Sequence, residues 1–116
     1  MELVFVYGTL RKGHGNHVLL KNSEFVDAGL TKKKYAMYAN GIPFVSDDEE
    51  VSSIFGELYK VSSHTLRMID LLEGHPGWYE RKKITVIGGK KRYKAWLYFN
   101  NAKEGHLVES GDYERR

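Results

Sequence analysis

A run of apolar and aromatic residues, Leu3–Tyr7, is followed at once by Gly8, and this junction constrains the fold more than any other stretch. An unbroken run of this kind suits a strand that is covered on both faces. Gly8 allows the chain to turn and another group to approach the backbone closely, and a loop containing Thr9 follows. Such a loop after a buried strand fixes free N–H groups around a small anionic or carbonyl-bearing ligand. A tight turn without a ligand is the simpler alternative.

Length and composition indicate one globular domain that spans residues 1–116. Hydrophobic residues make up 41% and charged residues 28% of the chain, as in ordinary globular proteins. No apolar run approaches the roughly 20 residues that cross a bilayer, and the start lacks the basic segment of a signal peptide. The chain has no cysteine, which excludes disulfides, thiolate nucleophiles and cysteine-ligated zinc. We expect a cytoplasmic protein without membrane contact, as a monomer or a homodimer.

The net charge of +3 raises the question of nucleic acid binding. The basic residues form three short runs within expected strands and hairpin turns, where solvated edges explain them. They are Lys32–Lys34, Arg81–Lys83 and Lys90–Arg92. No nucleic-acid-binding motif accompanies them, so we expect no specific nucleic acid partner. His14 and His17 have no further ligand at a helpful spacing, and no phosphate or dinucleotide loop is present, so we expect no metal and no cofactor.

Six segments have the residue types and the alternation of strands. They are Phe25–Ala28, Lys34–Ala39, Phe44–Val45, Ile54–Val61, Lys83–Ile87 and Tyr93–Phe99. We expect Gly29 and residues 40–43 to break the first strands, and Gly88-Gly89 to form a two-residue hairpin turn. Gly56 indicates a bulge or a close backbone approach within its strand.

One convincing helix follows the fourth of these strands. Ser62 or Ser63 can cap its start, and Leu66, Ile69 and Leu72, with Met68 beside them, predict a buried stripe. Gly74 supplies a left-handed end after Glu73, and Pro76 prevents continuation.

A shorter helical turn is expected over Val18–Leu20, with Asn16 as its cap. One main helix, this turn and at least six strands predict an α+β fold built on a curved mixed sheet or small mixed β-barrel.

Glu73 occupies an unusual place for a carboxylate. At the last turn of the helix it faces the negative end of the helix dipole, which raises its pKa if nothing compensates. A carboxylate with raised proton affinity suits a general base. An exposed glutamate at a frayed helix end is the alternative.

Four short motifs occur in an order that resembles the gamma-glutamylcyclotransferase-like family, in its short gamma-glutamylamine cyclotransferase branch. They are Val6–Leu10 with Gly13 and Asn16-His17, Gly56–Tyr59, Asp70–Gly74 with Tyr79–Arg81, and Ser110–Tyr113. Each is weak alone, but together they cover nearly the whole chain. Tyr113 departs from the tryptophan that this family more often has there.

The resemblance implies a small mixed β-barrel flanked by helices and a cofactor-independent enzyme. Its substrate would be a small gamma-glutamyl amine or peptide, whose α-amino group attacks the side-chain carbonyl to form 5-oxoproline and expel a free amine. Glu73 would match the catalytic glutamate, and the residues Tyr7, Gly8, Thr9 and Leu10 would bind the gamma-glutamyl part.

The roles of two further residues and one alternative function remain to be considered. Tyr79 and Arg81 are candidates for substrate binding, the latter as a partner for a carboxylate, although strand packing and surface charge explain them equally well. The second function is a binding module that holds a small carboxylate or amide metabolite and performs no chemistry.

Overall fold

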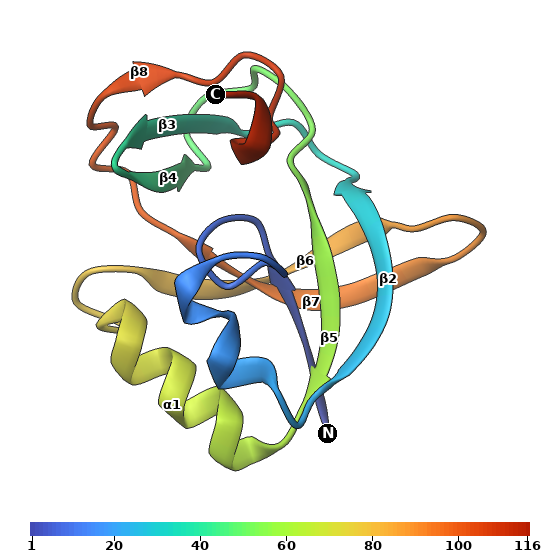
Figure 1. Ribbon diagram of the computed structural model, residues 1–116. Coiled ribbons are helices and arrows are strands. Elements are labelled where there is room, and N and C mark those ends of the chain that lie inside the picture. Colours follow the sequence, from blue (N-terminus) through green and yellow to red (C-terminus); the bar gives the residue numbers. More distant parts are fainter.

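Five strands close into a barrel in the computed structural model, which describes residues 1–116 (Figure 1). In order around the barrel they are β1 (Glu2–Val6), β5 (Phe55–Val61), β2 (Glu24–Thr31), β6 (Glu80–Ile87) and β7 (Arg92–Phe99). β1 pairs with β5 in the antiparallel sense and with β7 in the parallel sense. The predicted α+β class and the central place of the first strand are therefore confirmed.

A three-stranded sheet covers one end of the barrel (Figure 1). It consists of β4 (Ile42–Ser46), β3 (Ala36–Asn40) and β8 (His106–Leu107). Its inner side chains join those of the barrel in one buried cluster. The largest fully buried members of this cluster are Phe5, Met37, Ile54, Leu58 and Leu97. The barrel and the small sheet thus share one core.

The helix α1 (Ser63–Glu73) and the 3-10 turn η1 (Gly15–Leu20) lie side by side at the other end of the barrel (Figure 1). The predicted ends of α1 are confirmed, because Ser62 Oγ accepts the Thr65 N–H at 3.1 Å and Gly74 is left-handed with φ 66°. The predicted buried stripe is only partly correct, since Leu72 is 44% exposed. None of the helices has the length and apolarity to cross a membrane.

Two of the expected breaks between strands differ in the structure. Gly29 lies inside β2, paired with Gly56 of β5, and glycine is required there because a Cβ atom would lie 2.5 Å from the Ile87 carbonyl oxygen of β6. The turn between β6 and β7 has four residues, not two, since Ile87 pairs with Arg92.

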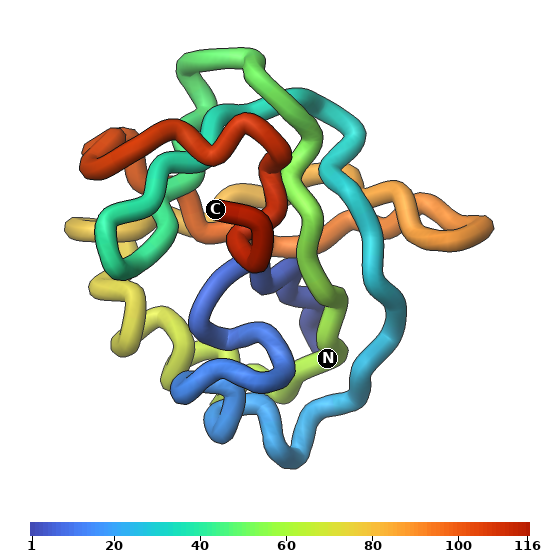
Figure 2. Tube along the Cα trace, turned by 45° about the horizontal axis from the view of Figure 1, so that its top comes forward, coloured from blue at the N-terminus to red at the C-terminus, as the bar shows by residue number.

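The 3-10 turn η2 (Tyr113–Arg115) packs against the loop that follows β1, as Figure 2 shows. Arg11 Nη1 donates to Asp112 Oδ1 at 2.9 Å, and His14 Nε2 lies 2.6 Å from Glu114 Oε1. Two contacts between residues about a hundred positions apart thereby hold the loop in place.

Gly56 confirms the predicted close approach rather than a bulge. A Cβ atom at this position would lie 2.5 Å from the Val6 carbonyl oxygen and 2.8 Å from Phe5 Cζ. We expect Gly56→Ala to lower the free energy of unfolding by about 1–3 kcal/mol through overpacking, as measured by urea denaturation. Gly89→Ala is the matched control, because a Cβ atom at Gly89 would have no other atom within 4 Å and we expect a change below about 0.5 kcal/mol. Equal losses in both variants would contradict this account.

Candidate active site

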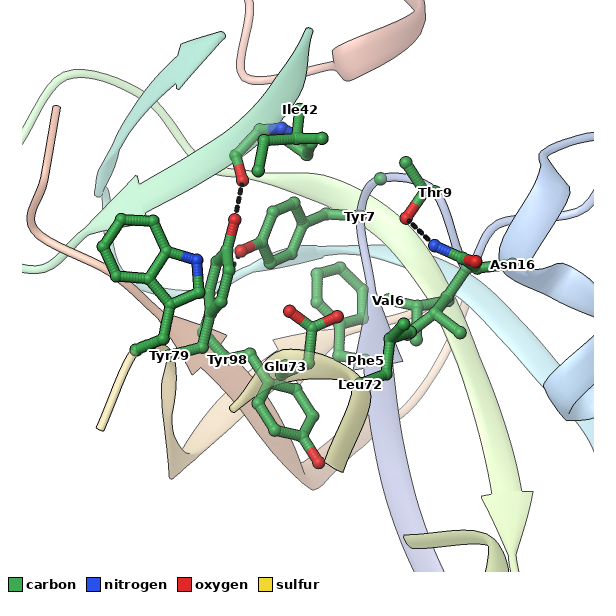
Figure 3. A pocket seen from close by; sticks show the side chains of 14 residues that line it. Phe5, Val6, Tyr7, Thr9, Asn16, Ile42, Leu72, Glu73, Tyr79 and Tyr98 are labelled. Atoms are coloured by element: carbon green, nitrogen blue, oxygen red, sulfur yellow. Dashed lines mark hydrogen bonds between the residues drawn. The ribbon is translucent and has the colours of Figure 1, made fainter. Parts of the chain in front are cut away.

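A cavity of about 210 Å³ lies where the loop after β1, the end of α1 and the start of β4 meet (Figure 3). Most of the residues around it are apolar or aromatic. They are Phe5, Val6, Tyr7, Gly8, Thr9, Leu10, Asn16, Ile42, Pro43, Leu72, Glu73, Trp78, Tyr79 and Tyr98. A mostly apolar cavity with a few converging polar groups is typical of a small-molecule site.

Glu73 is the only charged side chain that lines this cavity. Its carboxyl group projects into the cavity beside Tyr7 and Phe5 (Figure 3). Burial raises its pKa to about 7, with no neighbouring charge or hydrogen bond among the causes. The sequence predicts a raised pKa from the helix dipole, whereas the structure attributes the shift to loss of solvent.

The loop after β1 presents free donors beside the cavity. The backbone N–H groups of Gly8, Thr9 and Leu10 donate to no acceptor within the protein. The loop also packs closely on β4, because a Cβ atom at Gly8 would lie 2.4 Å from Pro43 Cγ. Glycine is therefore required at this position, and the N–H groups remain available to a ligand.

Asn16 secures this loop instead of capping the next helical turn, so its predicted role is wrong. Its side-chain Nδ2 donates to Thr9 Oγ1 at 2.9 Å, and its backbone N–H donates to the Thr9 carbonyl at 3.1 Å. The residue at the cap position is His14, which makes no side-chain capping bond. The side-chain amide of Asn16 thus binds a residue seven positions earlier in the sequence, and the rules for helix capping do not predict such a contact.

Tyr7 and Tyr79 line the cavity, and each already donates its hydroxyl proton to a backbone carbonyl. Tyr7 donates to the Tyr98 carbonyl and Tyr79 to the Pro43 carbonyl, each at 2.7 Å. Burial raises the pKa of both phenols well above the ordinary value, with smaller contributions from nearby negative charge such as Glu73. Both therefore stay neutral, and their oxygens keep lone pairs that can accept a hydrogen bond.

Arg81 lies away from the other predicted site residues. It does not line the cavity, and its guanidinium binds Asp70 through Nε at 2.8 Å and Nη2 at 3.2 Å. The guanidinium also lies 4.2 Å from the centre of the Trp96 ring. The structure thus brings together Glu73, Tyr79 and the Tyr7–Leu10 loop, but not Arg81.

Several lining residues were not anticipated from the sequence. Trp78 precedes Tyr79 and Leu72 precedes Glu73, so adjacency to the motifs could have indicated them. Ile42 and Tyr98 come from distant strands and carry no local signal. No group of three or more histidine, cysteine, aspartate or glutamate side chains in residues 1–116 is placed so that it could hold a metal ion.

The sequence matches the family described as "Gamma-glutamyl cyclotransferase, AIG2-like" over residues 4–115. The chain belongs to this family. A protein of Methanocaldococcus jannaschii, provisionally named as a gamma-glutamylcyclotransferase, is 56% identical over 98% of this chain and 97% of its own. Gamma-glutamylaminecyclotransferase C of Danio rerio is 37% identical over 97% of this chain and 74% of its own.

Solved structures support the same assignment of the cyclotransferase fold. The crystal structure of an AIG2-like protein from Mus musculus has a TM-score of 0.84 and 26% identity, covering 97% of this chain and 88% of that one. An uncharacterized protein from Pyrococcus horikoshii has a TM-score of 0.83 and 27% identity, covering 98% and 91%.

The largely buried carboxyl of Glu73 makes the stability of this protein depend on pH. Its folded-state pKa of about 7 lies above the ordinary 4.5, so its contribution to stability is fully present below about pH 4.5 and is lost as pH rises through 7. From pH 4 to pH 8, we expect the unfolding free energy of Glu73→Gln minus that of the wild type to increase by about 3 kcal/mol, because the glutamine does not ionise. Urea denaturation at both pH values measures this difference, and a constant difference would contradict it.

Proposed function

We propose that this chain converts a gamma-glutamyl amine or peptide to 5-oxoproline and a free amine, with Glu73 as general base and then general acid. One observation carries the proposal: a carboxyl group with a pKa of about 7 lies without a partner in a cavity bordered by unused N–H donors. Membership of the gamma-glutamyl cyclotransferase family supports the same reaction.

The cavity offers complementary groups to the charged head of such a substrate. No arginine, lysine or histidine lines it, so the free N–H groups of Gly8, Thr9 and Leu10 are the donors for the α-carboxylate or the reacting carbonyl. The α-ammonium would meet the Glu73 carboxylate and the phenol oxygens of Tyr7 and Tyr79. These two sets of groups distinguish the two ends of the substrate head.

The chemistry moves two protons from the α-nitrogen to the leaving nitrogen, one before ring closure and one after it. Glu73 takes a proton from the α-ammonium, and the freed amine attacks the side-chain carbonyl carbon to close the five-membered ring. The bond from that carbon to the leaving nitrogen then breaks, while Glu73 returns the proton to this nitrogen. The ring nitrogen gives its second proton to Glu73, and the released amine takes it up and leaves as an ammonium ion. No water is consumed, and a carboxyl group with a pKa near 7 suits both transfers.

Replacing the base tests this proposal. The purified wild type, incubated with a panel of gamma-glutamyl amines and dipeptides including glutathione, is expected to release 5-oxoproline detectable by mass spectrometry. Glu73→Gln keeps the size of the side chain but cannot take up the proton, so we expect turnover to fall by about 10²- to 10⁴-fold. Circular dichroism confirms that the variant is folded, and Glu24→Gln at an exposed position of β2 serves as the matched control with full activity.

The other outcomes separate the remaining interpretations. Oxoproline from Glu73→Gln at the wild-type rate would remove Glu73 from the mechanism. Saturable binding of a panel member without any product from the wild type would favour a binding module for a small carboxylate or amide metabolite.

The pH dependence of turnover follows from the same carboxyl group. The base must be ionised, so kcat/KM is expected to fall about tenfold per pH unit below the pKa of about 7 in the free enzyme. Initial rates between pH 5 and pH 8.5 measure this limb. An acid limb with an apparent pKa near 4.5 would show that a solvated carboxylate, not the buried one, controls the reaction.

A further inference from the structure

We propose that Asp70 and Arg81 form a positioning pair that holds the Glu73 carboxyl in the cavity by fixing the last turn of α1 to the barrel. This inference rests on the proposed function in so far as Glu73 is the base. It gives Arg81 a role that acts through the helix and not through contact with the substrate.

Asp70 links three elements through its side chain. Its carboxylate accepts two hydrogen bonds from Arg81 of β6, and a third from the Tyr98 hydroxyl of β7 at 2.6 Å. Although burial opposes ionisation, the hydrogen bonds from Arg81 and Tyr98 keep the pKa of Asp70 below its ordinary value. Bidentate and charge-assisted bonds of this kind fix geometry as well as supplying energy.

The last turn of α1 has few other side-chain anchors. Leu66 and Ile69 are buried, but they precede Asp70, whereas Leu71 is 76% exposed and Leu72 44% exposed. Asp70 is therefore the last firmly bound side chain before Glu73. Because the two residues are three positions apart, they lie on neighbouring parts of the same helix face.

Glu73 depends on this anchoring because its carboxyl group has no partner of its own. Its backbone carbonyl accepts the Tyr79 N–H at 3.1 Å, which ties the chain after the helix to the cavity wall. The direction of the side chain, however, follows the orientation of the helix end. Tyr98 completes the connection, since its ring lines the cavity while its hydroxyl binds Asp70.

Kinetics of Asp70→Asn and Arg81→Lys test the positioning role. The first variant removes the charge, and the second keeps the cation but loses the paired geometry. A misplaced base lowers kcat, so we expect kcat to fall by roughly ten- to a hundredfold in Asp70→Asn, less in Arg81→Lys, with KM within about twofold of the wild type. The double variant is expected to lose little more than Asp70→Asn alone.

Lys82→Ala is the matched control on the same strand. Lys82 Nζ also pairs with a carboxylate at 2.8 Å, that of Asp47, but this pair does not touch α1. We expect wild-type kcat and KM. Unchanged kcat in folded Asp70→Asn and Arg81→Lys would overturn the positioning role. A raised KM with unchanged kcat would also overturn it, and would place Arg81 in contact with the substrate.

A second measurement does not require activity. Carboxyl ¹³C NMR titration of Glu73 in each variant reports how well the carboxyl is held away from solvent. We expect its pKa to fall from about 7 toward 4.5 in Asp70→Asn and Arg81→Lys, and to stay unchanged in Lys82→Ala. An unchanged Glu73 pKa in all three variants would overturn the positioning role, whether or not the wild type makes 5-oxoproline. Absence of 5-oxoproline from the wild type would count only against the proposed function.

Discussion

Glu73 loses solvent on folding and receives no hydrogen bond or ion pair in return. The cost of burying such a group explains why it is half protonated near neutral pH, and why the surrounding structure must hold it firmly. The last turn of α1 positions this carboxyl group, and the apolar wall of the cavity keeps water away from it. The loop after β1 adds free N–H donors to the same cavity. The rest of the site is arranged around this one group.

The first strand connects stability to the site. Because β1 is paired on both sides within the barrel, the point at which the chain leaves it at Tyr7 is fixed. Gly8 then packs against Pro43 of the small sheet, so the barrel and that sheet together shape the loop. A rigid scaffold that presents a functional loop is a common division of labour in proteins.

Local chemistry explains what the sequence could predict. The ends of α1 followed from Ser62 and Gly74, and the strand before Gly8 followed from its apolar run, because each depends on neighbouring residues. The order of family motifs pointed to Glu73 and the loop. The contacts of Asn16, Gly29 and Arg81 could not be predicted, because their partners, Thr9, Gly56 and Asp70, are separated from them in sequence. Burial of Glu73 likewise depends on side chains from several elements.

The contacts of η2 have a consequence for the order in which the molecule is completed during synthesis. The loop after β1 leaves the ribosome before its partners Asp112 and Glu114, which follow it by about a hundred residues. A nascent chain that lacks them can form the β1–β5 pair but not the finished loop. The loop that borders the cavity therefore reaches its final arrangement only after residue 114 has been synthesised.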